Sequence, residues 1–150
     1  MIRFLFWSII VLCVLSGIRQ ACATDLWLSA TVASYHSNRD AEYNERNYGL
    51  GFEYGAADRW RAVGGVYDNS YYRTTVYGGA LYLYPVSQSI KVGVMLGLAS
   101  GYSHVVGPLA PVALPTIAIE GKQFGANIGV MPSRGGGIGT VGLQVKAVLR

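Results

Sequence analysis

The chain has 150 residues, of which 51% are hydrophobic and only 13% are charged, and its formal net charge is +4. Two basic residues, Arg3 and Arg19, belong to a predicted leader, and their removal lowers the excess from +4 to +2. That excess is too small to indicate a nucleic-acid partner. Both cysteines, Cys13 and Cys22, also lie in the leader, which excludes a disulfide framework or a Cys-ligated metal site in the remainder.

The first 23 residues have the pattern of a secretory signal peptide. Arg3 supplies the basic start, Phe4–Leu15 is almost wholly apolar, and Ala21–Ala23 is a small-residue cleavage site. The apolar run is shorter than the roughly 20 residues that a transmembrane helix needs. We therefore predict a cleaved signal peptide at residues 1–23 and one domain at residues 24–150; an uncleaved anchor is the alternative.

Four segments of the mature chain alternate apolar with small or neutral residues, and four further segments complete a set of eight strand candidates. This period of two is typical of β-strands, because successive side chains point to opposite faces. The predicted strands are Leu26–Tyr35, Tyr48–Gly55, Arg59–Tyr67, Thr74–Tyr84, Ile90–Ala99, Ala110–Glu120, Gln123–Met131 and Thr140–Leu149.

The face opposite the apolar side chains carries mostly Gly, Asn, Gln, Ser and Thr. A soluble sheet would place many charges there, whereas an uncharged, Gly-rich face suits the crowded interior of a small barrel whose apolar face meets lipid. The predicted fold class is therefore all-β, an eight-stranded antiparallel up-and-down transmembrane β-barrel. Glu53, Lys91, Glu120 and Lys146 are predicted to point inward as a polar plug, since buried charges need partners.

Tyr and Trp residues gather near the predicted strand ends. The residues concerned are Trp27, Tyr35, Tyr48, Tyr54, Trp60, Tyr67, Tyr82 and Tyr84. Amphipathic rings at both membrane boundaries would explain them, and the general preference of Tyr for strands explains them equally well.

The connections alternate between long and short. In an outer-membrane barrel the short turns face the periplasm and the long loops face outward. This rule places four residues on one outer rim: His36, Asp68, Ser70 and His104. A His and a Ser on neighbouring hairpins could supply a general base and a hydroxyl nucleophile, with Asp68 orienting the imidazole. The alternative is a solvated loop with exposed ion pairs, such as Glu42 or Glu45 with Arg46.

The mature chain resembles the lipid A palmitoyltransferase family of the Gram-negative outer membrane. The residues that carry the resemblance are Tyr35-His36, Glu42–Arg46, Gly49–Phe52, Asp68–Ser70, Val92–Val94, Pro108–Pro115 and Met131-Pro132. The resemblance implies an eight-stranded barrel that moves a palmitoyl chain from a phospholipid to lipid A without a cofactor. It implies His36 as general base and Ser70 as its hydroxyl partner. Asn69 stands where the family has Asp, with Asp68 one residue earlier, so both complete the candidate catalytic set.

The same resemblance suggests how an acyl chain would be held. The glycines predicted to point inward and leave room for the chain are Gly93, Gly97, Gly125, Gly129 and Gly142. A lumen simply filled by side chains is the alternative. Pro115 and Pro132 lack the N–H that a strand ladder needs, so they are candidates for a lateral gate. The expected partners are the outer-membrane lipids, and we expect a monomer. Two other functions stay open: a non-catalytic outer-membrane barrel with a structural or surface-interaction role, and a soluble barrel that binds a small apolar ligand.

Overall fold

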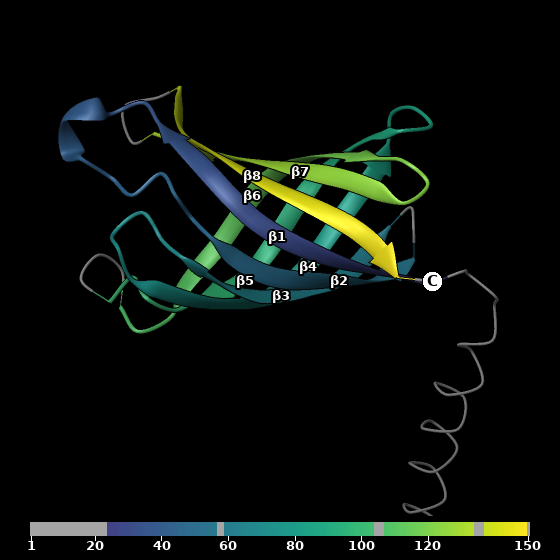
Figure 1. Cartoon of the computed structure of the whole chain (residues 1–150), viewed down its shortest axis with the longest axis horizontal. Helices are drawn as coiled ribbons and strands as arrows, with labels where there is room; N and C mark the ends of the chain where they lie inside the picture. Colours follow the sequence, from purple (N-terminus) through teal and green to yellow (C-terminus); the bar gives the residue numbers. More distant parts are fainter. Residues whose placement is uncertain (1–23, 57–58, 104–106, 134–136, 150) are drawn as a thin grey trace, which may run out of the picture.

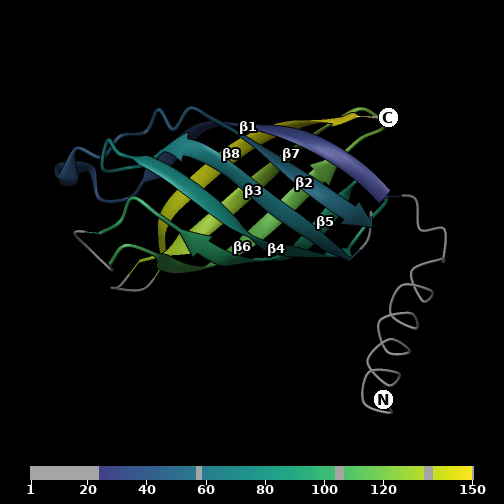
Figure 2. The ribbon, with the colours of Figure 1, turned by 90° about the horizontal axis from the view of Figure 1, so that it is seen from below.

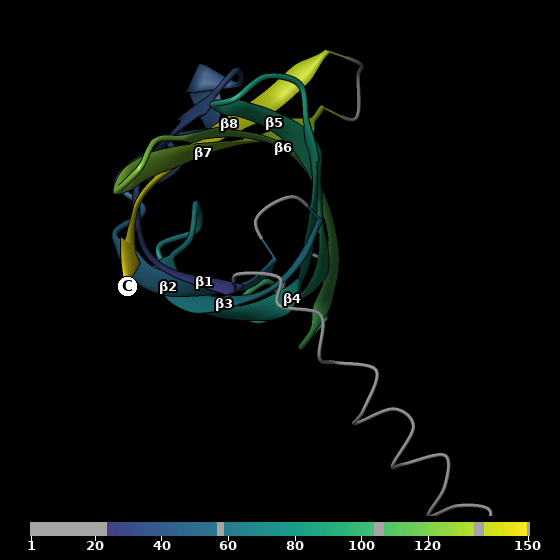
Figure 3. The ribbon, with the colours of Figure 1, turned by 90° about the vertical axis from the view of Figure 1, so that its right-hand side faces the viewer.

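The computed structural model describes residues 24–56, 59–103, 107–133 and 137–149, so the predicted signal peptide and His104 lie outside the described residues. Eight antiparallel strands follow one another around a closed barrel, in which β8 pairs with β1 (Figures 1 and 3). The elements are β1 (Thr24–His36), η1 (Arg39–Ala41, a short 3-10 helix), β2 (Gly49–Ala56), β3 (Trp60–Asp68), β4 (Thr74–Pro85), β5 (Ile90–Ala99), β6 (Ala110–Glu120), β7 (Phe124–Pro132) and β8 (Ile138–Leu149). The predicted fold class is confirmed. Every predicted strand bound agrees with the structure to within two residues.

The two ends of the barrel differ. Loop 1 (residues 37–48) with η1 lies at one end, and β1 begins and β8 finishes at the opposite end (Figures 1 and 2). Loop 2 (residues 69–73) joins β3 to β4 at the same end as loop 1, because the backbone N–H of Asn44 donates to the carbonyl of Ser70. We call this end the rim. Of the described residues, none form a helix long and apolar enough to cross a membrane.

The outer surface of the barrel is apolar. Leu50, Val76 and Leu98 are examples of outward aliphatic side chains that are at least 50% exposed. Large aromatic side chains are exposed near both ends of the barrel: Tyr35, Tyr48, Tyr54, Trp60, Tyr84 and Phe124. The membrane-interface explanation fails for Trp27, which is 3% exposed and lies inside the barrel, and for Tyr67, whose side chain also faces the interior. A surface of this kind suits lipid, with aromatic rings at the two interfaces.

Charged side chains inside the strands form a buried cluster, which we call the ionic floor. It consists of Glu53, Arg61, Lys91, Glu120 and Lys146, each no more than 7% exposed. The Glu120 carboxylate accepts from both terminal nitrogens of Arg61, from Lys91 at 2.8 Å and from Lys146 at 2.7 Å. Glu53 accepts from Arg61 at 2.8 Å and from Lys146 at 2.9 Å. The inward orientation predicted for Glu53, Lys91, Glu120 and Lys146 is confirmed. Arg61 also belongs to the cluster and was not predicted to do so.

The barrel wall is incompletely hydrogen-bonded between β6 and β7. These strands pair only from Thr116 with Gly129 to Glu120 with Gly125, whereas β6 pairs with β5 along its whole length. Within the described chain, Ala110–Pro115 therefore has no partner in β7. Pro115 lies at the point where the pairing stops, and Pro132 is the last residue of β7. Proline has no backbone N–H to donate, which explains why the hydrogen bonds between β6 and β7 do not continue toward the rim.

Candidate active site

His36 and Ser70 meet at the rim. The distance from His36 Nε2 to Ser70 Oγ is 2.8 Å, which is a hydrogen bond between the two side chains. His36 is the last residue of β1, paired with Thr140 of β8, and is only 4% exposed. The sequence prediction placed these two residues on one rim, and the structure brings their side chains into contact.

Loop 1 is bound to loop 2 by two asparagines, and this contact holds Ser70 beside His36. The backbone N–H of Asn44 donates to the carbonyl of Ser70 at 2.9 Å, and Asn44 Nδ2 donates to the carbonyl of Asn69 at 3.1 Å. Asn47 Nδ2 donates to the carbonyl of Asp68 at 2.8 Å. The Ser70–His36 geometry therefore depends on loop 1, and neither asparagine was singled out from the sequence.

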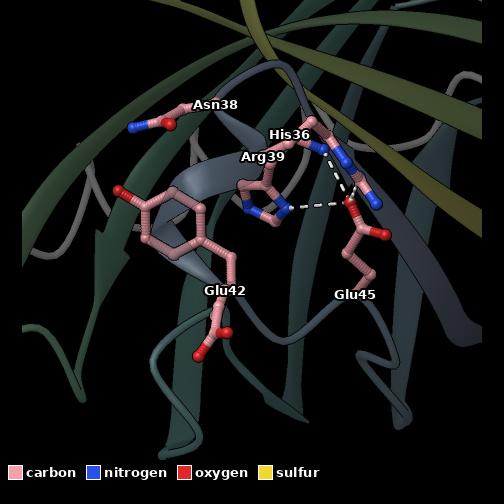
Figure 4. A pocket seen from close by; sticks show the side chains of 6 residues that line it. His36, Asn38, Arg39, Glu42 and Glu45 are labelled. Carbon is pink, nitrogen blue, oxygen red and sulfur yellow. Dashed lines mark hydrogen bonds and ion pairs between the residues drawn. The ribbon is translucent and has the colours of Figure 1, made fainter.

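Glu45 lies on the other side of the imidazole (Figure 4). Its Oε1 is 3.8 Å from His36 Nδ1 and accepts from the backbone N–H of His36 at 3.1 Å. Arg39 also donates to this oxygen. The bond from the His36 N–H, with the contribution of Arg39, lowers the pKa of the Glu45 carboxyl and keeps it ionised. The alternative expected from the sequence was an exposed ion pair of Glu42 or Glu45 with Arg46. In the structure Glu45 pairs with Arg39 and His36.

Asn69 is a structural residue of loop 2. It is fully buried at 0% exposed, and its Oδ1 accepts from the backbone N–H groups of Tyr71 and Arg73. Its Nδ2 donates to Thr75 Oγ1 at 3.0 Å and to the carbonyl of Gly101 at 3.1 Å. The side chain is thus fully used in closing the turn. Asp68 is exposed at the end of β3, and its backbone, not its carboxylate, makes the bonds to Asn47 and Tyr48.

Restoring the aspartate of the palmitoyltransferase pattern is expected to damage the protein. In Asn69→Asp a carboxylate oxygen replaces Nδ2 and faces the carbonyl of Gly101, so two hydrogen bonds are lost and an unfavourable contact appears. We expect the free energy of unfolding to fall by about 1–3 kcal/mol. Asp68→Asn is the control and should leave the free energy of unfolding unchanged. An unchanged free energy of unfolding in Asn69→Asp would contradict this structural role of Asn69.

Below the rim the barrel encloses a cavity of about 870 Å³, within the range of roughly 300–1,000 Å³ that is usual for ligand sites. His36 and Ser70 line its upper end, and apolar side chains such as Val63, Leu81 and Met95 line its deeper part. The unpaired segment of β6 and the end of β7 contribute Ala110–Leu114 and Met131–Ser133 to the lining. The cavity therefore reaches from the His36–Ser70 pair to the incompletely paired wall.

Of the five glycines predicted to make room for an acyl chain, Gly129 and Gly142 line this cavity, and Gly93, Gly97 and Gly125 do not. Gly93 and Gly97 are not among its lining residues, and a methyl group on either would lie within 2.3 Å of a backbone oxygen of β4. They allow β4 and β5 to approach closely. Gly129 and Gly142 line the cavity, and a methyl group on Gly142 would meet no heavy atom within 4 Å. Among the described residues, no group of three or more His, Cys, Asp and Glu side chains could hold a metal ion.

The chain is similar to solved β-barrel structures. A structure described as a de novo design of transmembrane β-barrels matches with a TM-score of 0.61 and 14% identity, covering 83% of this chain and 95% of that one. The outer membrane protein Ail of Yersinia pestis matches with a TM-score of 0.51 and 12% identity, covering 83% and 99%. The fold is that of a transmembrane β-barrel.

These similarities establish the fold of the chain. No protein-family profile matches it, and no curated protein matches it. The finer resemblance to the lipid A palmitoyltransferases stays a prediction from the sequence.

Proposed function

We propose that this chain is an acyltransferase of the Gram-negative outer membrane that moves a palmitoyl-type acyl chain from a phospholipid to lipid A. The observation that carries the proposal is the 2.8 Å contact between Ser70 Oγ and His36 Nε2 at the upper end of a largely apolar cavity. A hydroxyl held by an imidazole is the arrangement that activates a serine toward an ester. The apolar barrel surface would keep the protein in the bilayer that contains both lipids.

The reaction would proceed in two ester exchanges. In the first, Ser70 gives its proton to His36 Nε2 while Oγ bonds to the acyl carbonyl carbon of the phospholipid. The lysophospholipid oxygen then leaves and takes that proton from the imidazolium. In the second, a lipid A hydroxyl gives its proton to Nε2 and attacks the acyl-serine, and Ser70 Oγ recovers the proton as it leaves. His36 is the general base and then the general acid in each exchange.

The acyl chain would enter the barrel sideways. Pro115 and Pro132 border the stretch where β6 and β7 do not pair, and the cavity lining includes both sides of that stretch. A chain passing there would cross a wall that has no strand-to-strand hydrogen bonds to break. The ionic floor would limit how deep the chain can go, because an alkyl chain cannot replace the hydrogen bonds of buried charges.

Filling the cavity at Gly142 is expected to reduce transfer without harming the fold. Gly142 pairs with Ser34 and Gly129, close below the rim, and a side chain there would extend into free space. In Gly142→Met we expect kcat/KM to fall at least about tenfold, since the added side chain occupies the volume of several methylene groups. Equal activity in the variant and the parent would argue against the cavity as the acyl site.

Gly78→Met is the matched control for this experiment. Gly78 pairs with Leu98, which faces outward, and a methyl group on Gly78 has no neighbour closer than 3.9 Å. The same substitution therefore fits on the lipid side of the wall and should leave transfer unchanged. Thermal unfolding of both variants checks that neither loses stability.

Mass spectrometry of lipid A tests the proposed function. The full chain is expressed in a Gram-negative host that lacks its own lipid A palmitoyltransferase, and the lipid A is compared with that of cells carrying His36→Ala. We expect an added palmitoyl mass with the parent chain and none with the variant. A non-catalytic barrel with a surface role predicts that neither chain changes the lipid A.

A further inference from the structure

We propose that Glu45 is a positioning residue for His36: its carboxylate selects the imidazole tautomer in which Nδ1 carries the proton and stabilises the imidazolium that forms during transfer. This inference rests on the proposed function, in which His36 Nε2 must accept the proton of Ser70. It replaces the sequence expectation that Asp68 would orient the imidazole.

The two ring nitrogens of His36 face different groups, Ser70 on one side and Glu45 on the other. Nε2 is 2.8 Å from Ser70 Oγ, so it can accept from the hydroxyl only if the ring proton is on Nδ1. Nδ1 is buried and makes no hydrogen bond within the described residues. The nearest carboxylate oxygen is Glu45 Oε1, 3.8 Å away. A small rotation of the ring or of the Glu45 side chain would bring these two atoms within hydrogen-bond distance.

Hydrogen bonds fix the position of Glu45 beside His36. The backbone N–H of His36 donates to its Oε1 at 3.1 Å, and Arg39 donates to the same atom. The backbone N–H of Ser34 donates to the carbonyl of Glu45 at 3.0 Å, which attaches this part of loop 1 to β1. The carboxylate is thus fixed beside the residue whose ring it would orient (Figure 4).

The groups around the imidazole determine the sign of the expected electrostatic effect. From loop 1, Glu45 and Arg39 bring opposite charges, and the centre of the tilted Tyr43 ring lies 4.7 Å from the centre of the His36 ring. From loop 2, Ser70 contacts Nε2, and from β8 the uncharged Thr140 lies opposite His36. Removing the negative charge of Glu45 should make His36⁺ easier to deprotonate, and removing the positive charge of Arg39 should make it harder.

The test combines NMR titration of the His36 ring with the pH dependence of transfer, for the full chain in detergent micelles. The spectrum of His36→Ala assigns the ring signal. In Glu45→Gln we expect the titration midpoint and the acidic limb of kcat/KM to move to lower pH, and the plateau to fall about tenfold to a hundredfold. In Arg39→Gln both should move to higher pH. Glutamine keeps an oxygen that can accept the His36 N–H, so loop 1 should retain its fold.

Glu42→Gln is the control, because Glu42 is an exposed carboxylate of the same loop, and it should move neither quantity. A lower plateau in Glu45→Gln with an unchanged midpoint would mean that Glu45 only supports the loop, and would overturn the inference. Shifts of opposite sign in Glu45→Gln and Arg39→Gln support it. If those shifts occur while the parent chain transfers no acyl group, the proposed function fails and the coupling of Glu45 to His36 stands.

Discussion

Ser70→Ala is expected to lower acyl transfer in detergent micelles by about a thousandfold or more. The alanine variant has no nucleophile to accept the acyl group, and His36 Nε2 loses its 2.8 Å partner. The barrel should fold normally because the backbone contact from Asn44 to Ser70 does not involve the hydroxyl. The measurement is release of lysophospholipid from a labelled phospholipid, with purified lipid A as acceptor.

Ser37→Ala is the matched control for Ser70→Ala. Ser37 follows His36 directly, is exposed, and its hydroxyl donates to the carbonyl of Gly139. Its loss should change transfer by no more than a few fold. The double variant His36→Ala with Ser70→Ala should be no slower than either single variant, because residues that act as one unit are not additive. Full activity in Ser70→Ala would remove the serine from the mechanism.

Glu120→Gln is expected to lower the free energy of unfolding by about 3–5 kcal/mol, the cost of leaving buried charges uncompensated. Glu120 accepts from Arg61, Lys91 and Lys146, so its neutralisation removes one of the two negative charges that face three positive ones. Urea unfolding in lipid vesicles, followed by tryptophan fluorescence, measures the change. Trp27 reports on this region, since Arg61 and Lys146 lie over its ring at 5.9 and 5.1 Å.

Glu42→Gln serves as the control here as well, because Glu42 is exposed in loop 1. Its effect on unfolding should stay within about 0.5 kcal/mol, as is usual for surface substitutions. A change of less than about 1 kcal/mol in Glu120→Gln would show that the ionic floor contributes little to stability. The remaining hydrogen bonds of the floor would then be sufficient to hold the barrel together.

The fold could be predicted from the sequence because a barrel strand has a strict period of two. For Ile90–Ala99 and Ala110–Glu120, the alternation predicted the first and last residue of each strand correctly, even though the second strand contains two prolines. Residue type alone does not place Trp27, because aromatic rings suit both the membrane interface and the interior. Its inward direction follows from the alternation of β1, since the neighbouring Leu28 is exposed, and the cations of Arg61 and Lys146 lie over its ring.

The candidate site could be predicted only in part. His36 ends β1 and Ser70 follows the end of β3. Because alternate strands of an up-and-down barrel run in the same direction, the sequence placed both residues at the same end of the barrel. The roles of Glu45 and Asn69 could not be read in this way, since loops have no fixed period that relates spacing to direction. The side chain of Asn69 accepts hydrogen bonds from the backbone of its own turn. Glu45 contacts His36 because loop 1 folds back toward the end of β1. Such contacts depend on tertiary structure.

The most direct measurement of the central claim is acyl transfer by the purified full chain in vesicles of defined composition. The vesicles contain a phospholipid with an isotopically labelled palmitoyl chain and unlabelled lipid A, and both lipids are analysed by mass spectrometry. We expect labelled palmitate on lipid A with the parent chain and none with Ser70→Ala. Lipid A that stays unlabelled with the folded parent chain would contradict the central claim.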